Sequence, residues 1–237
     1  MRVSTGIKGL DEMLDGGFPE GRVILLCGGP GTGKTIFSLQ FLAAAAERGE
    51  HGVYVTLEEP KSLVLENVEV FGWKLREREA NKTFRVLDFC AVPFGVETYE
   101  VKSRDTGDIV LSMTKDLVNA VKEINAKCVV LDPLNSITVH EQRAGLKRYR
   151  IASIFDELRN LRVTSVLTSE VTSHEDFYME EFLADGVIWL EKSIQNFNLI
   201  KTVRIEKMRG VKHDEQPRRY IINDKGITVY NTEPVKF

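Results

Sequence analysis

The residues with the clearest chemical potential form a glycine-rich segment, Gly28–Thr35, which reads GGPGTGKT. A short apolar run, Val23–Cys27, precedes it, and an alanine- and leucine-rich run, Ile36–Ala46, follows it. A strand, the pattern GxxxxGK[ST] and a helix together form a phosphate-binding P-loop. Its glycines let backbone N–H groups turn inward around phosphate oxygens, and the helix N-terminus adds partial positive charge.

Each part of this segment has an expected role toward a nucleoside triphosphate. Lys34 is expected to reach the β- and γ-phosphates, and the Thr35 hydroxyl is expected to bind Mg²⁺. A chance glycine-rich turn is the alternative, but every fixed position of the motif matches and the flanking runs fit. The predicted nucleotide-binding residues of this segment are Gly29, Pro30, Gly31, Thr32, Gly33, Lys34, Thr35 and Ile36.

Two adjacent acids, Glu58 and Glu59, follow an apolar run that covers residues 51–57. Open α/β sheets place their chemistry at the carboxyl ends of strands. One of these carboxylates is therefore expected to orient or deprotonate a water molecule that attacks the γ-phosphate. The alternative is a pair of solvated acids at the start of a helix that begins with Pro60. The P-loop one strand earlier favours the catalytic interpretation.

A further acid, Asp132, ends the apolar run Cys128–Leu131. Four apolar residues followed by Asp form the Walker B pattern, in which the carboxylate holds Mg²⁺ through its water shell. The alternative is a strand-terminal aspartate without a role, since the pattern is short and common. Its place downstream of the P-loop favours the metal, so Thr35 and Asp132 are the predicted metal residues.

Two basic stretches lie far from the P-loop in sequence. Lys207 and Arg209 close a predicted strand, and they either form a solvated sheet edge or approach a phosphate in the manner of an arginine finger. The other stretch leads into a helix and is either a solvated face or a contact for an anionic partner. It contains His140, Arg143, Lys147, Arg148 and Arg150.

The elements that must position these residues follow from hydrophobic periodicity. Strands are predicted over residues 23–27, 51–57, 83–89, 128–132, 163–169 and 186–190, and later over 199–207, 218–222 and 226–230. Helices are predicted around residues 7–14, 36–46, 62–73 and 108–125 and up to about 161, with a loop over 90–107. This alternation predicts an α/β fold with a mostly parallel sheet, flanking helices and a β-rich C-terminal section. The lack of repeats and linkers predicts one domain, residues 1–237.

Composition limits the class of protein. The 237 residues are 43% hydrophobic and 28% charged, as in globular domains with a sizeable core. A net charge of −3 lacks the basic footprint of an obligate nucleic-acid binder. Cys27, Cys90 and Cys128 lie in or beside apolar runs without metal or disulfide spacing, so reduced core cysteines are expected. Without a signal peptide or an apolar run near ~20 residues, a soluble cytoplasmic protein is expected.

With these motifs placed, the chain resembles the KaiC-like and RadA-like ATPases of the RecA superfamily over essentially its whole length. Gly28–Thr35 matches the Walker A motif of that family, and Leu131-Asp132 matches its Walker B motif. Glu58-Glu59 resembles the paired catalytic glutamates of the KaiC branch. The most KaiC-like feature is Lys207-Met208-Arg209-Gly210, followed by His213. The other matching segments are Ser4–Gly17 and Phe71-Gly72-Trp73.

The resemblance implies a Mg²⁺-dependent ATPase that acts as a homo-oligomeric ring, with a hexamer expected and ATP or ADP bound at the subunit interface. It implies that Lys207 and Arg209 lie near the γ-phosphate bound by the adjacent subunit, while Met208, His213 and Asp224 help hold the nucleoside or phosphates there. The implied catalytic residues are Glu58, Glu59, Lys34, Lys207 and Arg209.

The chain departs from the KaiC pattern in three respects. KaiC has two tandem ATPase halves and this chain has one. Met179–Phe182 stands where the phosphorylated half has adjacent Ser and Thr, so autokinase activity is not expected. Pro133 stands where the family often has Ser after the Walker B acid.

Two other functions compete with the hydrolytic ring. One alternative is a recombinase-like ATPase that binds single- or double-stranded DNA through the basic residues at 143–150. Another is a slow ATPase with a signalling or scaffold role, whose assembly ATP controls. No membrane partner is expected.

Overall fold

The structure is a computed structural model of the chain, and it describes residues 1–90, 109–137, 143–171 and 179–234. Of the sequence-based expectations, most of the loop over residues 90–107 and the residue His140 lie outside these ranges.

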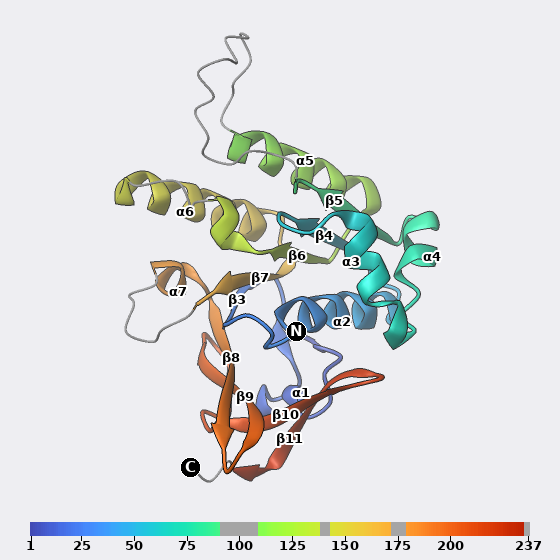
Figure 1. Cartoon of the computed structure of the whole chain (residues 1–237). Coiled ribbons are helices and arrows are strands. Elements are labelled where there is room, and N and C mark those ends of the chain that lie inside the picture. Colours follow the sequence, from blue (N-terminus) through green and yellow to red (C-terminus); the bar gives the residue numbers. More distant parts are fainter. Residues whose placement is uncertain (91–108, 138–142, 172–178, 235–237) are drawn as a thin grey trace.

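The described residues form a nine-stranded sheet in the order β11-β10-β9-β8-β3-β7-β6-β4-β5 (Figure 1). Its parallel part contains β3 (Val23–Gly28), β4 (Gly52–Thr56), β5 (Phe84–Asp88), β6 (Cys128–Asp132), β7 (Thr164–Glu170) and β8 (Gly186–Gln195). The antiparallel part contains β9 (Asn198–Met208), β10 (Arg218–Asn223) and β11 (Gly226–Pro234). The predicted fold class, with its β-rich C-terminal section, is confirmed.

Helices cover both faces of the parallel part, which explains why its central strands are continuous apolar runs. One apolar layer lies beneath α1 (Leu10–Met13), α2 (Lys34–Glu47), α3 (Lys61–Asn67) and α4 (Leu75–Ala80). The opposite layer lies beneath α5 (Ile109–Ile124) and α6 (Ala144–Asn160). The remaining short helix, α7 (Met179–Leu183), leads into β8.

Several boundaries differ from the sequence-based prediction. The helix predicted over residues 62–73 ends at Asn67 and is followed by a 3₁₀ turn, Glu69–Phe71, which ends at Gly72 with a left-handed φ of 70°. The pattern did not predict α4, nor the short ladder between β1 (Arg2–Val3) and β2 (Phe18–Pro19). Strand β8 pairs with β3 only as far as Leu190, but it continues beyond that residue. It continues because β9 pairs with it along its whole remaining length, up to the hairpin turn.

The cysteines also correct one expectation. Cys27 and Cys128 are buried free thiols, and burial raises the pKa of Cys128 to about 12. Cys90, which follows the end of β5, is only half-buried, so the prediction that it is a core residue is wrong. Cys90 lies two residues beyond β5, which is the last strand of the sheet and has a neighbouring strand on one side only.

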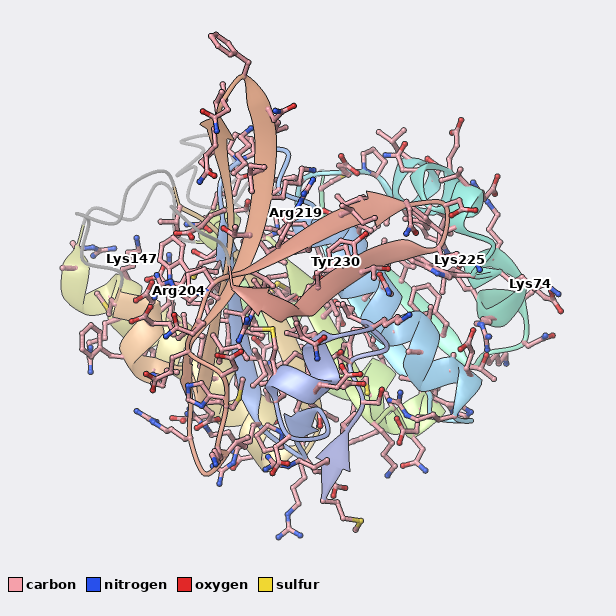
Figure 2. The ribbon with its side chains drawn as sticks, turned by 90° about the horizontal axis from the view of Figure 1, so that it is seen from below. Lys74, Lys147, Arg204, Arg219, Lys225 and Tyr230 are labelled. Atoms are coloured by element: carbon pink, nitrogen blue, oxygen red, sulfur yellow. The ribbon has the colours of Figure 1, made fainter. Side chains whose placement is uncertain are left out.

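The C-terminal hairpin formed by β10 and β11 packs against the segment that carries the glycine-rich loop. Figure 2 shows Arg219 and Tyr230 side by side on this hairpin, where they face each other across the ladder. Its turn, marked by Lys225, lies beside the segment that carries Lys74 (Figure 2). Consistent with this, a Cβ added at Gly226 would meet the Trp73 ring at 2.8 Å.

Candidate functional site

A cavity of about 300 Å³ opens at the carboxyl edge of the parallel strands. This is the edge at which open α/β sheets bind ligands. The cavity gathers the glycine-rich loop after β3, the acids after β4, the end of β6 and the end of β7. Its lining residues are Pro30, Gly31, Gly33, Lys34, Thr35, Ile36, Tyr54, Thr56, Glu58, Glu59, Asp132, Pro133 and Glu170.

The loop that begins this cavity depends on two of its glycines. A Cβ at Gly28 would lie 2.6 Å from the carbonyl oxygen of Leu190, so only glycine fits between β3 and β8 here. Gly33 has a left-handed φ of 98° and precedes the first residue of α2 without a side-chain cap. The first N–H groups of this 14-residue helix therefore face the cavity edge without a capping side chain, as an anion site requires.

Lys34 is buried at the base of the loop. Its Nζ donates hydrogen bonds to the carbonyl oxygens of Gly28, at 2.9 Å, and Gly29, at 3.3 Å. The same ammonium lies 3.5 Å from Oε1 of Glu170, whose side chain is half-exposed. Sequence reasoning missed Glu170, although it directly follows the predicted strand 163–169 and therefore had to reach the same edge.

Asp132 is the centre of a cluster of hydroxyl groups. Its Oδ2 accepts hydrogen bonds from Thr35 Oγ1 and from the Tyr54 hydroxyl, each at 2.7 Å, and its Oδ1 accepts one from Thr168 Oγ1. Burial raises the pKa of Tyr54 well above its usual range, and the Asp132 charge raises it further, so this tyrosine stays a donor.

The predicted metal residues therefore lie together. Thr35 and Asp132 offer hard oxygen atoms, and Mg²⁺ takes only one or two such protein ligands when phosphates and water complete its shell. The hydrogen bonds of Tyr54 and Thr168 to Asp132 were not predicted, because they depend on the strand order: β4 and β7 flank β6.

The two glutamates after β4 both line the cavity and both have exposed side chains. Oε1 of Glu58 accepts a hydrogen bond from Ser136 Oγ at 2.6 Å, while the Glu59 carbonyl accepts one from Thr56 Oγ1. Their carboxylates thus lie at the mouth of the cavity, where a water molecule has access to them.

Lys207 and Arg209 are here called the cation pair. Lys207 pairs with Val187, which pairs with Leu25 in the middle of β3, and Arg209 lies further toward the opposite edge of the sheet. The Arg209 N–H donates to the Asp185 carbonyl, and the Asp185 N–H donates to the carbonyl of Val23, the first residue of β3. The glycine-rich loop instead follows the last residues of β3. Strand β3 has six residues at ~3.3 Å each, so its first and last residues lie roughly 20 Å apart. Neither member of the pair lines the cavity of its own chain.

The remaining predicted nucleotide contacts are dispersed. Met208 is 3% exposed as a whole residue, and its side chain packs against Gly186, so little of it is accessible in this chain. His213 is half-buried, with Nδ1 3.1 Å from the Val211 carbonyl. Asp224 is exposed in the turn between β10 and β11, so the structure does not group it with the cation pair.

The described basic residues of the 143–150 stretch lie at the start of α6. Arg143 and Arg148 are exposed and Lys147 is half-buried, and none of the stretch lines the cavity. A DNA contact through these residues stays a prediction. Met179–Phe182 lies within α7, where Glu180 is buried. Among the residues that the structure describes, no helix is long and apolar enough to span a lipid bilayer.

A glycine-rich loop between a central parallel strand and a helix, with acids at the ends of β4 and β6, defines a P-loop protein of the RecA type. The family model for the KaiC ATPase matches residues 3–234, and this chain belongs to that family. The resemblance inferred from the motifs is confirmed.

Relatives support the assignment over nearly the full length. A UPF0273 protein of Thermotoga maritima is 38% identical over 239 residues, which cover 98% of this chain and 97% of the relative. The circadian clock protein KaiC3 of Synechocystis is 32% identical over 233 residues, and the match covers 96% of this chain but 45% of KaiC3. The crystal structure of a KaiC-like protein from Pyrococcus horikoshii superposes with a TM-score of 0.84 at 35% identity, over 97% of this chain and 99% of that one.

Proposed function

We propose that this protein is a Mg²⁺-dependent ATPase that hydrolyses ATP between two copies of the chain. The observation that carries the proposal is the separation of the P-loop from the cation pair within one chain. Neither Lys207 nor Arg209 lines the cavity of its own chain, and Arg209 lies near the first residue of β3, away from the P-loop. A second copy can supply both cations.

Such an arrangement joins unlike surfaces. The P-loop edge of one copy meets the cation-pair edge of the next, and head-to-tail contacts of this kind generate rings when the rotation closes. A hexameric ring is the assembly that the family resemblance favours. We also propose that residues 1–237 act as one ATPase domain, because the hydroxyl of Tyr220 in the C-terminal section donates to the Thr32 carbonyl of the P-loop at 2.5 Å.

Each group of residues has a role in this reaction. Backbone N–H groups of the P-loop and Lys34 bind the phosphates, while Thr35 and Asp132 hold Mg²⁺, which when bound neutralises phosphate charge. Glu58 and Glu59 orient the attacking water molecule at the cavity mouth. The partner's cation pair stabilises the charge that develops on the γ-phosphate. The family resemblance adds Met208, His213 and Asp224 of the second copy to the contacts with the nucleotide.

The test is the Arg209→Ala variant. Removing a cation that acts in trans on the transition state is expected to lower turnover by ~10³-fold or more, with ATP affinity nearly unchanged. Phosphate release measures the first quantity, and titration with a fluorescent ATP analogue measures the second.

The matched control is Arg219→Ala, because Arg219 is also an exposed arginine and lies on the neighbouring strand β10 (Figure 2). This variant is expected to keep wild-type turnover. Equal losses of affinity and turnover in Arg209→Ala would show that Arg209 binds ATP without a special role in the transition state. Wild-type turnover in Arg209→Ala would exclude it from the reaction.

A further inference from the structure

Backbone carbonyls at the end of α7 hold the side chains of the cation pair. Lys207 Nζ donates to the carbonyl of residue 181, and Arg209 Nη2 donates to that of residue 182 at 3.2 Å. Arg159 Nη2, from α6, donates to the next carbonyl, that of residue 183. The last carbonyls of a helix have no partner within the helix and carry partial negative charge, so they suit cations.

A buried carboxylate, Asp185, completes this arrangement. Its side chain is 4% exposed, and Oδ2 accepts hydrogen bonds from Arg159 Nε at 3.2 Å and from the Val23 N–H at 3.1 Å. Its other oxygen, Oδ1, lies 3.7 Å from Arg209 Nη1 and 3.8 Å from Arg22 Nη1. Because the carboxylate is withdrawn from water, its attraction for these guanidinium groups is weakly screened.

The Arg209 side chain needs such support. It is 53% exposed, and a long, exposed arginine has many rotamers that it must give up before it can act on a partner. Burial lowers the pKa of Lys207 and the neighbouring Arg209 charge lowers it further, so the two cations also disfavour each other. Asp185 contacts Arg209 twice, through its carbonyl to the backbone N–H and through its carboxylate to the guanidinium group.

We propose that Asp185 is a positioning residue that fixes the cation pair in the orientation presented to the P-loop of the adjacent subunit. This inference rests on the proposed function. The competing role is purely structural, since Asp185 also joins the first residue of β3 to α6 through Val23 and Arg159. Assemblies of two different subunits separate the two roles.

The reference assembly combines Lys34→Ala and Arg209→Ala subunits, co-expressed with different affinity tags and purified on both tags. The first lacks its phosphate-binding ammonium but presents a cation pair, and the second has the opposite defect. Turnover is expected to recover to about a quarter of the wild-type value in a randomly mixed ring, because a quarter of the interfaces pair the two intact halves. If this assembly stays inactive, the proposed function fails, independently of Asp185.

The test variant is Asp185→Asn, which keeps the shape of the side chain and removes its charge. Alone, it is expected to lower turnover by about 100-fold, the effect of a misplaced catalytic group, with ATP affinity nearly unchanged. Combined with Lys34→Ala subunits it should recover as the reference assembly does, because its own P-loop is intact. Combined with Arg209→Ala subunits it should stay inactive, because neither subunit presents an oriented cation pair.

The reverse pattern would overturn the inference. In that pattern, Asp185→Asn subunits recover turnover with Arg209→Ala subunits but not with Lys34→Ala subunits. Such a result would mean that Asp185→Asn damages the P-loop of its own subunit and leaves the cation pair intact. Wild-type turnover in Asp185→Asn alone would overturn it as well.

If this variant does not fold, Asp185→Glu, which keeps the charge and moves it by one methylene, is tested in the same assemblies. The same recovery pattern is expected, and a failure to recover with Lys34→Ala would contradict the inference. The matched control, Arg22→Ala, removes the exposed guanidinium beside Asp185 and should leave turnover unchanged.

Discussion

At the scale of single residues, the hydroxyl groups around Asp132 determine where its carboxylate points. Thr35 donates to Oδ2 from the P-loop, and Tyr54 donates to the same oxygen from the adjacent strand β4. A metal ion bound by Thr35 would use a lone pair of the hydroxyl oxygen, so the O–H could still donate to Asp132. Tyr54, buried and with its pKa raised, holds the same carboxylate oxygen from β4.

The Tyr54→Phe variant tests this role. Removing a group that orients a metal-binding carboxylate costs roughly 10- to 100-fold in metal affinity in proteins, so the apparent Mg²⁺ affinity in the presence of ATP is expected to fall by a similar factor. The nucleotide affinity measured without Mg²⁺ is expected to stay nearly unchanged, because the side chains that Tyr54 bonds, Asp132 and Thr35, are the predicted metal residues and not the backbone N–H groups that hold phosphate. Titration of ATP binding with Mg²⁺ gives both values. An equal loss with and without Mg²⁺ would show that Tyr54 supports the cavity as a whole.

The sequence predicts some of these residues and not others, for a physical reason. Lys34, Glu58 and Asp132 each follow an apolar run, and parallel strands bring their carboxyl ends to one edge whatever their order. Tyr54 lies inside a strand, and its partner depends on which strand is next to β4. The contact between Asp185 and Arg209 likewise requires β9 to fold back along β8. Such pairings follow from the topology, which local pattern does not contain.

At the scale of elements, the C-terminal hairpin supports the P-loop directly. The Tyr220 hydroxyl on β10 donates to the Thr32 carbonyl, and a Cβ at Gly33 would meet Ile222 at 2.8 Å. Gln40 of α2 donates to the Ile227 carbonyl and accepts from its N–H. The β-rich section was predictable from alternation, but its contact with the P-loop was not, since more than 180 residues separate the partners.

The stability that the Tyr220 hydroxyl contributes is expected to decrease at alkaline pH. Burial raises the pKa of Tyr220, so the folded state keeps the phenol proton above pH 10, where an unfolded chain loses it. The contribution of this hydroxyl to stability is therefore complete below about pH 10 and is lost as the pH rises toward the folded-state pKa, by about 1.4 kcal/mol per pH unit. The Tyr220→Phe variant should show a shallower alkaline decrease in the free energy of unfolding than the wild type.

Urea unfolding at a series of alkaline pH values measures this slope. Tyr149→Phe is the matched control, because Tyr149 is 67% exposed and is expected to leave the slope unchanged. An identical slope in the wild type and in Tyr220→Phe would mean that Tyr220 ionises equally in both states and does not hold the P-loop as a protonated donor.

At the scale of the whole molecule, the proposed function makes an isolated chain incomplete. Neither member of its cation pair lines its own cavity, so a second copy is needed to supply both cations. In the proposed assembly ATP would contact both copies, so by linkage it should strengthen association, and association should strengthen catalysis. Contacts between unlike surfaces close into a ring or continue as a filament, and both satisfy every internal P-loop.

Dilution tests this incompleteness. As the protein is diluted in saturating Mg-ATP, turnover per subunit is expected to fall in parallel with the loss of assembled species, because a dissociated subunit retains its P-loop but has no partner cations. Phosphate release and light scattering at each concentration give the two curves, and Arg209→Ala provides the floor reached by a subunit without the partner's arginine. Constant turnover per subunit at concentrations where only single chains are present would contradict hydrolysis between copies. The mass of the assembly could instead change with ATP while almost no phosphate is released. That result would identify ATP as the ligand that controls a scaffold, because the cation pair would then join subunits without accelerating hydrolysis.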